Sequence, residues 1–477
     1  MRYNKLFFLS ALLLTLFSCK KVIDIDESDL IEESNAFLTV SNCEQGVIGA
    51  YGALAVDMNI LLNSTFSDEV KKSEFYNAAT THEWQYSTVD VGIRDNFTAI
   101  TPNYTIIDRV NRVLKALPTA DSLKAADNAA LRLRVKAEVL FLRAYAHFEI
   151  FRYYCGNYVA DSLAMPYMEE PSLEPQARIK MGVYFQKLKA DLAEAKNLLP
   201  NNLTDINRAT KLAASALQAR VALYTKDWTN AITYSTEYID AKALAPRTSF
   251  TNIWKDANTE ELVFRLVKTT ALARIGSLFR GTSASAANIG TVTWQPSNKL
   301  WDSYDQVNDI RFSAYVKDEP ILTAAARPSR IVQKYAGTTY GSATENVANG
   351  KVFRTGEMYL IRAEARAESG DFTGPNSAES DINDLRAARI NGYVPETFVS
   401  KDAAIAAVMS ERFKELAFEG HRFWDLKRRG LPVERLSDDA PNANSTTLPA
   451  NNFRFVLPIP DYEMKSNKLM KQNEGYY

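Results

Sequence analysis

Apolar residues recur every three or four positions through most of this chain, which is the pattern of helices that bury one face. The segment 131–154 shows this spacing at Leu133, Ala137, Leu140, Ala144, Phe148 and Phe151. The segment 183–200 repeats the pattern and stops at Pro200, a residue that ends helices. We therefore predict a mainly α fold.

Two stretches pair such helices in the manner of a tetratricopeptide repeat. In 209–244, an alanine-rich helix leads to a turn at Lys226-Asp227 and then to a second helix. Small residues in the first helix allow the second to pack closely against it. The segment 355–389 is similar, and 135–200 resembles a third, degenerate copy. Because the copies are unevenly spaced, we expect a tetratricopeptide-like helical-repeat scaffold with long irregular loop insertions.

The helical spacing fails in two segments, 60–105 and 246–350, which are rich in Gly, Ser, Thr, Asn and aromatic residues. The β-like runs at 261–267 and 290–294 predict a few short strands within or beside these segments. Long loops on a rigid scaffold often form a binding surface. We divide the folded part of the chain into an N-terminal helical region, 37–245, and a C-terminal region, 246–477.

The first residues have the layout of a cleaved signal peptide. Arg2 and Lys5 precede an apolar run that ends at Phe17 and is too short to span a bilayer as a stable helix. Ser18-Cys19 then resembles the lipobox of bacterial lipoproteins, in which the cysteine is acylated and becomes the new N-terminus. The alternative is an ordinary secretory signal in which Cys19 is incidental. We predict a lipoprotein signal peptide over 1–18 and a lipidated, acidic tether over 19–36 that anchors the chain to a membrane.

Composition and motifs narrow the function classes. The chain has 56 Lys and Arg against 57 Asp and Glu, so no strongly basic face is implied and no nucleic-acid partner is expected. The histidines do not have the spacing of metal ligands, and the sequence contains no CxxC, P-loop or Gly-x-Ser-x-Gly motif. We therefore expect no metal, no cofactor and no catalytic activity. Cys43 and Cys155 either pair in an oxidising compartment or remain small buried residues.

The segment 411–430, ERFKELAFEGHRFWDLKRRG, concentrates charge and could be mistaken for an active site. Helical spacing places its apolar residues on one face, and we expect Gly420 to cap a helix and Trp424 to be buried. We also expect its acids to pair with bases one turn away, with no partner in distant sequence. An active site needs an acid, base or nucleophile within mutual reach in a pocket. We therefore interpret this segment as packed structure.

This segment also closely resembles the C-terminal signature of the SusD/RagB family of Bacteroidetes outer-membrane lipoproteins. Other segments similar to the family are 103–114, 300–312, 356–372 and 453–477, the last with Glu474 where a proline is usual. The resemblance implies a SusD-like fold and a cell-surface lipoprotein of the outer membrane. It further implies capture of a nutrient, usually a glycan, and its transfer to a TonB-dependent (SusC-like) porter. A peptide or another nutrient is the alternative ligand, and a surface hydrolase is a third, disfavoured possibility.

Sugar binding requires flat aromatic rings for the C–H faces of a pyranose and planar polar groups for its hydroxyls. Two loop tryptophans have such neighbours, one in 75–90 and one in 292–298. We predict that these loops line one exposed cleft. The predicted ligand-binding residues are Trp84, Gln85, Tyr86, Trp294, Gln295 and Asn298. The alternative is that both tryptophans are buried beneath their own loops.

Overall fold

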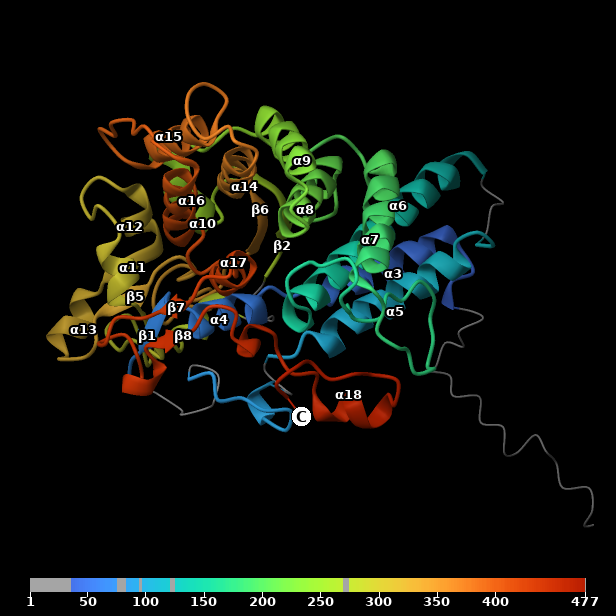
Figure 1. Cartoon of the computed structure of the whole chain (residues 1–477), viewed down its shortest axis with the longest axis horizontal. Helices are drawn as coiled ribbons and strands as arrows, with labels where there is room; N and C mark the ends of the chain where they lie inside the picture. Colours follow the sequence, from blue (N-terminus) through green and yellow to red (C-terminus); the bar gives the residue numbers. More distant parts are fainter. Residues whose placement is uncertain (1–35, 75–82, 94–96, 121–124, 269–273, 477) are drawn as a thin grey trace, which may run out of the picture.

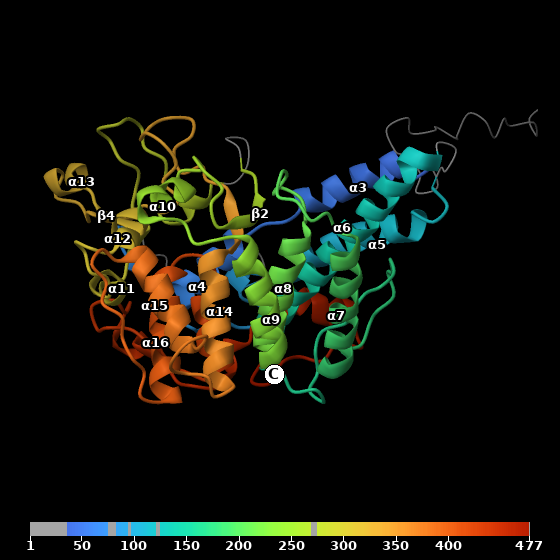
Figure 2. The same ribbon diagram turned by 90° about the horizontal axis from the view of Figure 1, so that it is seen from above.

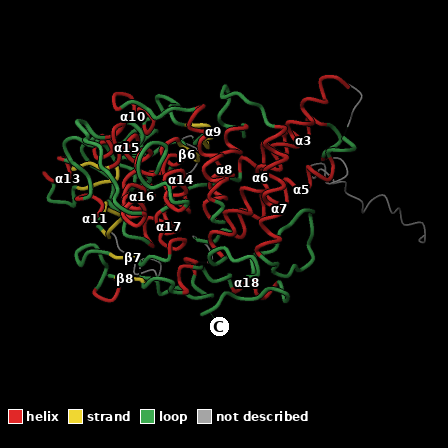
Figure 3. Tube along the Cα trace, turned by 45° about the horizontal axis from the view of Figure 1, so that its top comes forward, coloured by secondary structure: helices red, strands yellow, loops and turns green. Residues whose placement is uncertain are grey.

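The computed structural model describes residues 36–74, 83–93, 97–120, 125–268 and 274–476. The predicted signal peptide, Cys19 and the predicted tether up to residue 35 lie outside the described residues. The described chain is mostly helical, with short strands among the loops (Figure 3). The mainly α scaffold predicted from the sequence is confirmed.

Paired helices form the body of the molecule. The pairs are α6 (Ala125–Tyr154) with α7 (Met181–Leu198), α8 (Lys211–Tyr224) with α9 (Trp228–Ala241), and α14 (Thr355–Glu368) with α15 (Ala378–Arg389). These are the three pairs predicted from the sequence. Helix α9 also packs against α14, and α7 against α8, so the pairs form one continuous row (Figure 2).

The α8–α9 pair shows how the sequence sets this packing. Thr210 caps α8 by accepting a hydrogen bond from the backbone N–H of Ala213, and α8 is buried from Leu212 to Leu223. Small residues allow neighbours to approach α8 from several sides. Lys226 makes the turn with a φ of 57°, and Asp227 caps α9 by accepting from the N–H of Asn230.

The N-terminal helices pack against this row (Figure 1). The stretch Val40–Phe66 has the length and apolar content of a membrane-spanning helix, but the structure divides it into α3 (Val40–Gly52) and α4 (Asp57–Phe66). Helix α3 packs on α5 (Ile100–Ala116) and α6. The expectation that 60–105 lacks helices was wrong for α4 and the start of α5. Cys43 and Cys155 are both free and buried, so they form no disulfide with each other.

The C-terminal insertions contain short elements. The antiparallel strand pairs are β1 (Val70–Lys72) with β3 (Trp294–Pro296), β2 (Leu262–Leu266) with β6 (Gly350–Arg354), β4 (Val316–Asp318) with β5 (Arg330–Val332), and β7 (Val433–Glu434) with β8 (Thr447–Leu448). The predicted run 261–267 forms β2, whereas only Trp294 of 290–294 belongs to a strand. Short helices complete this half: α10 (Arg247–Trp254), η3 (Ile275–Leu278), α11 (Asn298–Asp302), α12 (Ile310–Tyr315) and α13 (Pro320–Ala324).

The remaining elements close the fold. They are α16 (Lys401–Glu415), α17 (Arg422–Arg429), η4 (Ala443–Ser445), η5 (Phe453–Phe455) and α18 (Asp461–Ser466). Trp424 of α17 is fully buried, as predicted, and its indole N–H donates to Asn59 Oδ1 at 2.8 Å. Gly420 does not cap α16, which ends five residues earlier. It adopts a φ of +82°, and a Cβ there would lie 2.2 Å from the Asn59 amide nitrogen.

Candidate functional site

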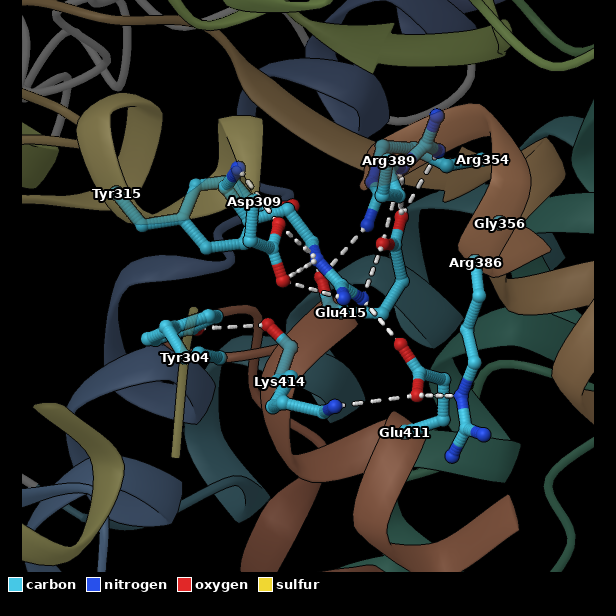
Figure 4. Close-up of polar contacts among 12 residues, drawn as sticks. Tyr304, Asp309, Tyr315, Arg354, Gly356, Arg386, Arg389, Glu411, Lys414 and Glu415 are labelled. Atoms are coloured by element: carbon cyan, nitrogen blue, oxygen red, sulfur yellow. Dashed lines mark hydrogen bonds and ion pairs between the residues drawn. The ribbon is translucent and has the colours of Figure 1, made fainter. Parts of the chain in front are cut away.

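The charged segment 411–430 forms an ion-pair network with residues far away in the sequence (Figure 4). The Glu415 carboxylate accepts from Arg354 at 2.9 Å, Arg389 at 3.0 Å and Arg311 at 3.2 Å. Glu411 accepts from Arg311 at 2.5 Å and Arg386 at 2.7 Å. The expectation of purely local pairs was therefore wrong, although the local Glu411–Lys414 pair is present at 3.3 Å. A charge buried this deeply needs several partners, and distant segments supply most of them here.

The network is electrostatically satisfied. Burial would raise the pKa of Glu415, but Arg389, Arg354 and Arg311 outweigh it and hold the pKa well below its ordinary value. At Glu411, burial likewise raises the pKa, but Arg311, Lys414 and Arg386 lower it more strongly, to about 2. Both carboxylates are inaccessible to solvent and occupied by cations. These two carboxylates therefore hold the core together and are not free to bind a ligand.

The structure corrects two predicted ligand residues, Trp84 and Tyr86. Trp84 is 3% exposed, donates from its indole N–H to the Phe66 carbonyl at 2.8 Å, and has the Arg435 guanidinium 4.0 Å from its ring centre. Tyr86 is 2% exposed and stacks on the Phe66 ring. Neither ring has an open face for a sugar. The side chains alternate here, so Gln85 between them is exposed.

Trp294, Gln295 and Asn298 lie on β3 and the start of α11. In the β1–β3 ladder, Trp294 pairs with Lys72 and Gln295 with Lys71, so Trp294 and Gln295 face opposite sides. Trp294 is half-buried against the core of the C-terminal half. Gln295 is 8% exposed and donates to Ser73 Oγ at 3.1 Å, so its amide nitrogen is already engaged. Of these three residues, Trp294 and Asn298 retain accessible surface.

Asn298 joins two cations that the sequence analysis did not single out. Its Oδ1 accepts from Lys71 Nζ at 2.8 Å and from Arg330 Nη1 at 3.0 Å. The Arg330 guanidinium also lies 4.5 Å from the centre of the Trp301 ring. We call Lys71, Asn298 and Arg330 the Asn298 cluster. No local pattern reveals it, because its residues come from β1, α11 and β5.

The cluster is held by the backbone around it. Asp439 accepts from the N–H groups of Asn298 at 2.7 Å and Lys299 at 3.0 Å, which fixes the start of α11. The two predicted loop segments do approach the same region, because Trp84 is bonded to Phe66 at the end of α4, just before β1. Their tryptophan rings nevertheless share no exposed surface, since Trp84 is buried. The predicted cleft between the two rings was therefore wrong.

Comparison with known proteins identifies the family. A model described as the SusD family matches residues 293–476, and one described as starch-binding associating with outer membrane matches 25–223. The second model matches the N-terminal half of the chain and the first matches the C-terminal half. The chain belongs to the SusD family. The predicted family and SusD-like fold class are therefore confirmed.

One relative of this SusD-family chain matches it over nearly its full length, and another matches a shorter part of it. SusD-like protein P2 of Formosa agariphila is 24% identical over 98% of both chains. The starch-binding protein SusD of Bacteroides thetaiotaomicron is 34% identical over 128 residues, which is 26% of this chain and 21% of that protein. The shorter match is the more similar in sequence, whereas the longer one shows that the whole chain follows the family pattern.

Solved structures share the SusD fold. A SusD superfamily protein of Bacteroides thetaiotaomicron superposes with a TM-score of 0.78 at 21% identity, covering 91% of this chain and 99% of that one. Surface glycan-binding protein A of the same organism, solved with laminarihexaose, gives a TM-score of 0.71 at 19% identity, with coverage of 91% and 99%. At these identities the likeness concerns the fold.

Proposed function

We propose that this SusD-family chain is a non-catalytic surface lipoprotein that binds a glycan and delivers it to a TonB-dependent porter of the outer membrane. The observation that carries the proposal is the match of residues 25–223 to a family described as starch-binding and associated with the outer membrane. The laminarihexaose complex of a similarly folded protein supports a glycan as the ligand class. Anchoring through Cys19 is part of the same proposal.

We propose that the ligand surface comprises Trp294 and the Asn298 cluster. Trp294 and Asn298 are four positions apart, on β3 and at the start of α11, and both are partly exposed. An aromatic ring can stack on a pyranose face, while the cluster supplies amide, ammonium and guanidinium donors for hydroxyl oxygens. Exposed Gln85 remains a further candidate, because its side chain points away from the buried pair beside it.

Titration calorimetry with laminarihexaose and malto-oligosaccharides tests both parts. Stacking contributes about 1 kcal/mol per ring, so Trp294→Ala should weaken binding roughly fivefold or more. Asn298→Ala should also weaken it, whereas Trp228→Ala, at a half-buried tryptophan on α9, should not. Wild-type protein that binds peptides but none of a broad oligosaccharide set would favour the non-glycan alternative. Release of shorter sugars during the titration would instead identify a hydrolase.

A further inference from the structure

A groove separates α5, the loop 166–176 and α18 on the N-terminal half of the molecule. Its volume is about 290 Å³. Its apolar lining residues include Ile100, Tyr104, Ile107, Pro166, Met168 and Met470. None of these belongs to the β1–β3 ladder or the Asn298 cluster. The groove is therefore separate from the proposed glycan site.

Hydrogen bonds fix the groove wall, and they already engage amide and hydroxyl donors of its side chains. Tyr104 Oη donates to the Pro166 carbonyl at 3.0 Å, and Asn111 Nδ2 donates to the Met168 carbonyl at 3.0 Å. On the other side, Asn467 Nδ2 donates to the carbonyl of Gln176 at 2.8 Å. The loop is thereby held open between α5 and α18. A neutral sugar would find few free donors in this groove.

Among the described residues, the charged ones that line the groove are all acidic: Asp108, Glu170, Glu174 and Glu463. Asp108 is paired with Arg112 at 2.8 Å, and Glu463 accepts weakly from Asn467 at 3.4 Å. Glu170 and Glu174 lie on the loop, where Glu174 is exposed. Such a rim attracts cations and repels anionic lipid headgroups and anionic glycans.

Leu173, another lining residue, is 99% exposed between Pro171 and Pro175. The flanking prolines restrict the backbone of this segment, so presenting Leu173 to a partner costs less conformational entropy. An exposed leucine beside an apolar groove extends the apolar contact surface outward. The shape is therefore that of an apolar cleft with a projecting apolar residue and an acidic edge.

We propose that this groove docks an extended segment of the porter, one that carries lysine or arginine beside apolar side chains. The inference rests on the proposed function, since it assigns a surface to the proposed partner. Apolar side chains of the segment fill the groove and cover Leu173, while its cation meets Glu170 and Glu174. Complementary charge of this kind orients a partner and speeds its association.

The test uses the full-length lipoprotein, tagged and purified from outer membranes, with the retained porter identified and quantified by mass spectrometry. Two variants alter the groove: Glu170→Lys with Glu174→Lys, and Leu173→Asp. The charge-matched control is Asp371→Lys with Asp402→Lys, at exposed acids near α15 and α16. We expect each groove variant to retain roughly tenfold less porter, and the control to retain as much as wild type.

Two further measurements separate this inference from the proposed function. Laminarihexaose affinity and melting temperature should be unchanged in both groove variants. Undiminished porter in both variants, or an equal loss in the control, would overturn the docking site while leaving the porter partnership intact. Loss of glycan affinity in the groove variants would instead make the groove a ligand site. Wild-type protein that retains no porter would overturn the partnership and the docking site together.

Discussion

Replacing Glu415 by glutamine tests whether the buried ion-pair network stabilises the fold. The carboxylate is fully buried and accepts from guanidinium groups of Arg311, Arg354 and Arg389 at 2.9 to 3.2 Å. Glutamine keeps the size of the side chain but removes its negative charge and turns an N–H group toward three cations. Breaking a buried pair by neutralising one partner typically costs about 3–5 kcal/mol. We expect a loss of that order in the free energy of unfolding.

Urea unfolding followed by circular dichroism measures this loss, and Glu174→Gln is the matched control. Glu174 is exposed on the loop 166–176, so the same chemical change there should alter stability by no more than about 0.5 kcal/mol. A Glu415→Gln protein within about 1 kcal/mol of wild type would refute the view that the network holds the C-terminal half together.

The pH dependence gives the same experiment a second readout. The pKa of Glu415 lies well below its ordinary value of 4.5, because Arg389, Arg354 and Arg311 outweigh the effect of burial. The carboxylate therefore contributes stability that is present above pH 4.5 and is lost as the pH falls through the lowered pKa. The difference in the free energy of unfolding between wild type and Glu415→Gln should therefore decrease as the pH is lowered below 4.5. A difference that stays constant from pH 7 to pH 3 would show that packing, not charge, is responsible.

Four other predictions concern single substitutions elsewhere in the chain. Trp424→Ala should lower the free energy of unfolding by about 3–5 kcal/mol in calorimetry, because it empties a fully buried site. A folded His421→Ala protein should keep its affinity for ligand in titration. Burial raises the pKa of Glu69 to about 8. Its contribution to stability should therefore fall by roughly 1.4 kcal/mol for each unit by which the pH rises between pH 5 and 8. Glu69→Gln should remove this pH dependence from the free energy of unfolding measured in urea. Cys19→Ala should move the protein from the membrane fraction to the soluble fraction, whereas mass spectrometry showing an unacylated Cys19 in mature wild type would contradict lipidation.

The sequence predicted those parts of the fold that depend on local patterns. The three helix pairs follow from apolar spacing, and the burial of Trp424 follows from its place on an apolar helical face. Family resemblance rests on the same kind of signal, since its motifs are contiguous stretches. Local patterns fail where a neighbour comes from far away. Nothing near Glu415 in the sequence indicates that Arg311 and Arg354 reach it, because strands and helices of the insertions must first fold back onto α16.

The predicted ligand residues failed for the same physical reason. Trp84 lies in a polar, aromatic stretch that is typical of an exposed loop, yet it is bonded to Phe66 and covered by Arg435. Both partners belong to other elements, so composition alone could not distinguish a buried ring from an open one. Trp294 differs because it lies in a short ladder and is only half-buried.

The buried ion pairs around Glu415 and the partly exposed Asn298 cluster should respond differently to substitution. Arg311 of α12, Arg354 at the end of β6 and Arg389 of α15 all converge on Glu415 of α16, which fastens the insertions to the helical row. The Asn298 cluster is assembled from the same fastened insertions, but it lies outside the network. Its side chains can therefore be exchanged without uncovering a buried charge. Substitutions there should change ligand preference at little cost in stability, whereas substitutions at the network should cost stability before they affect binding.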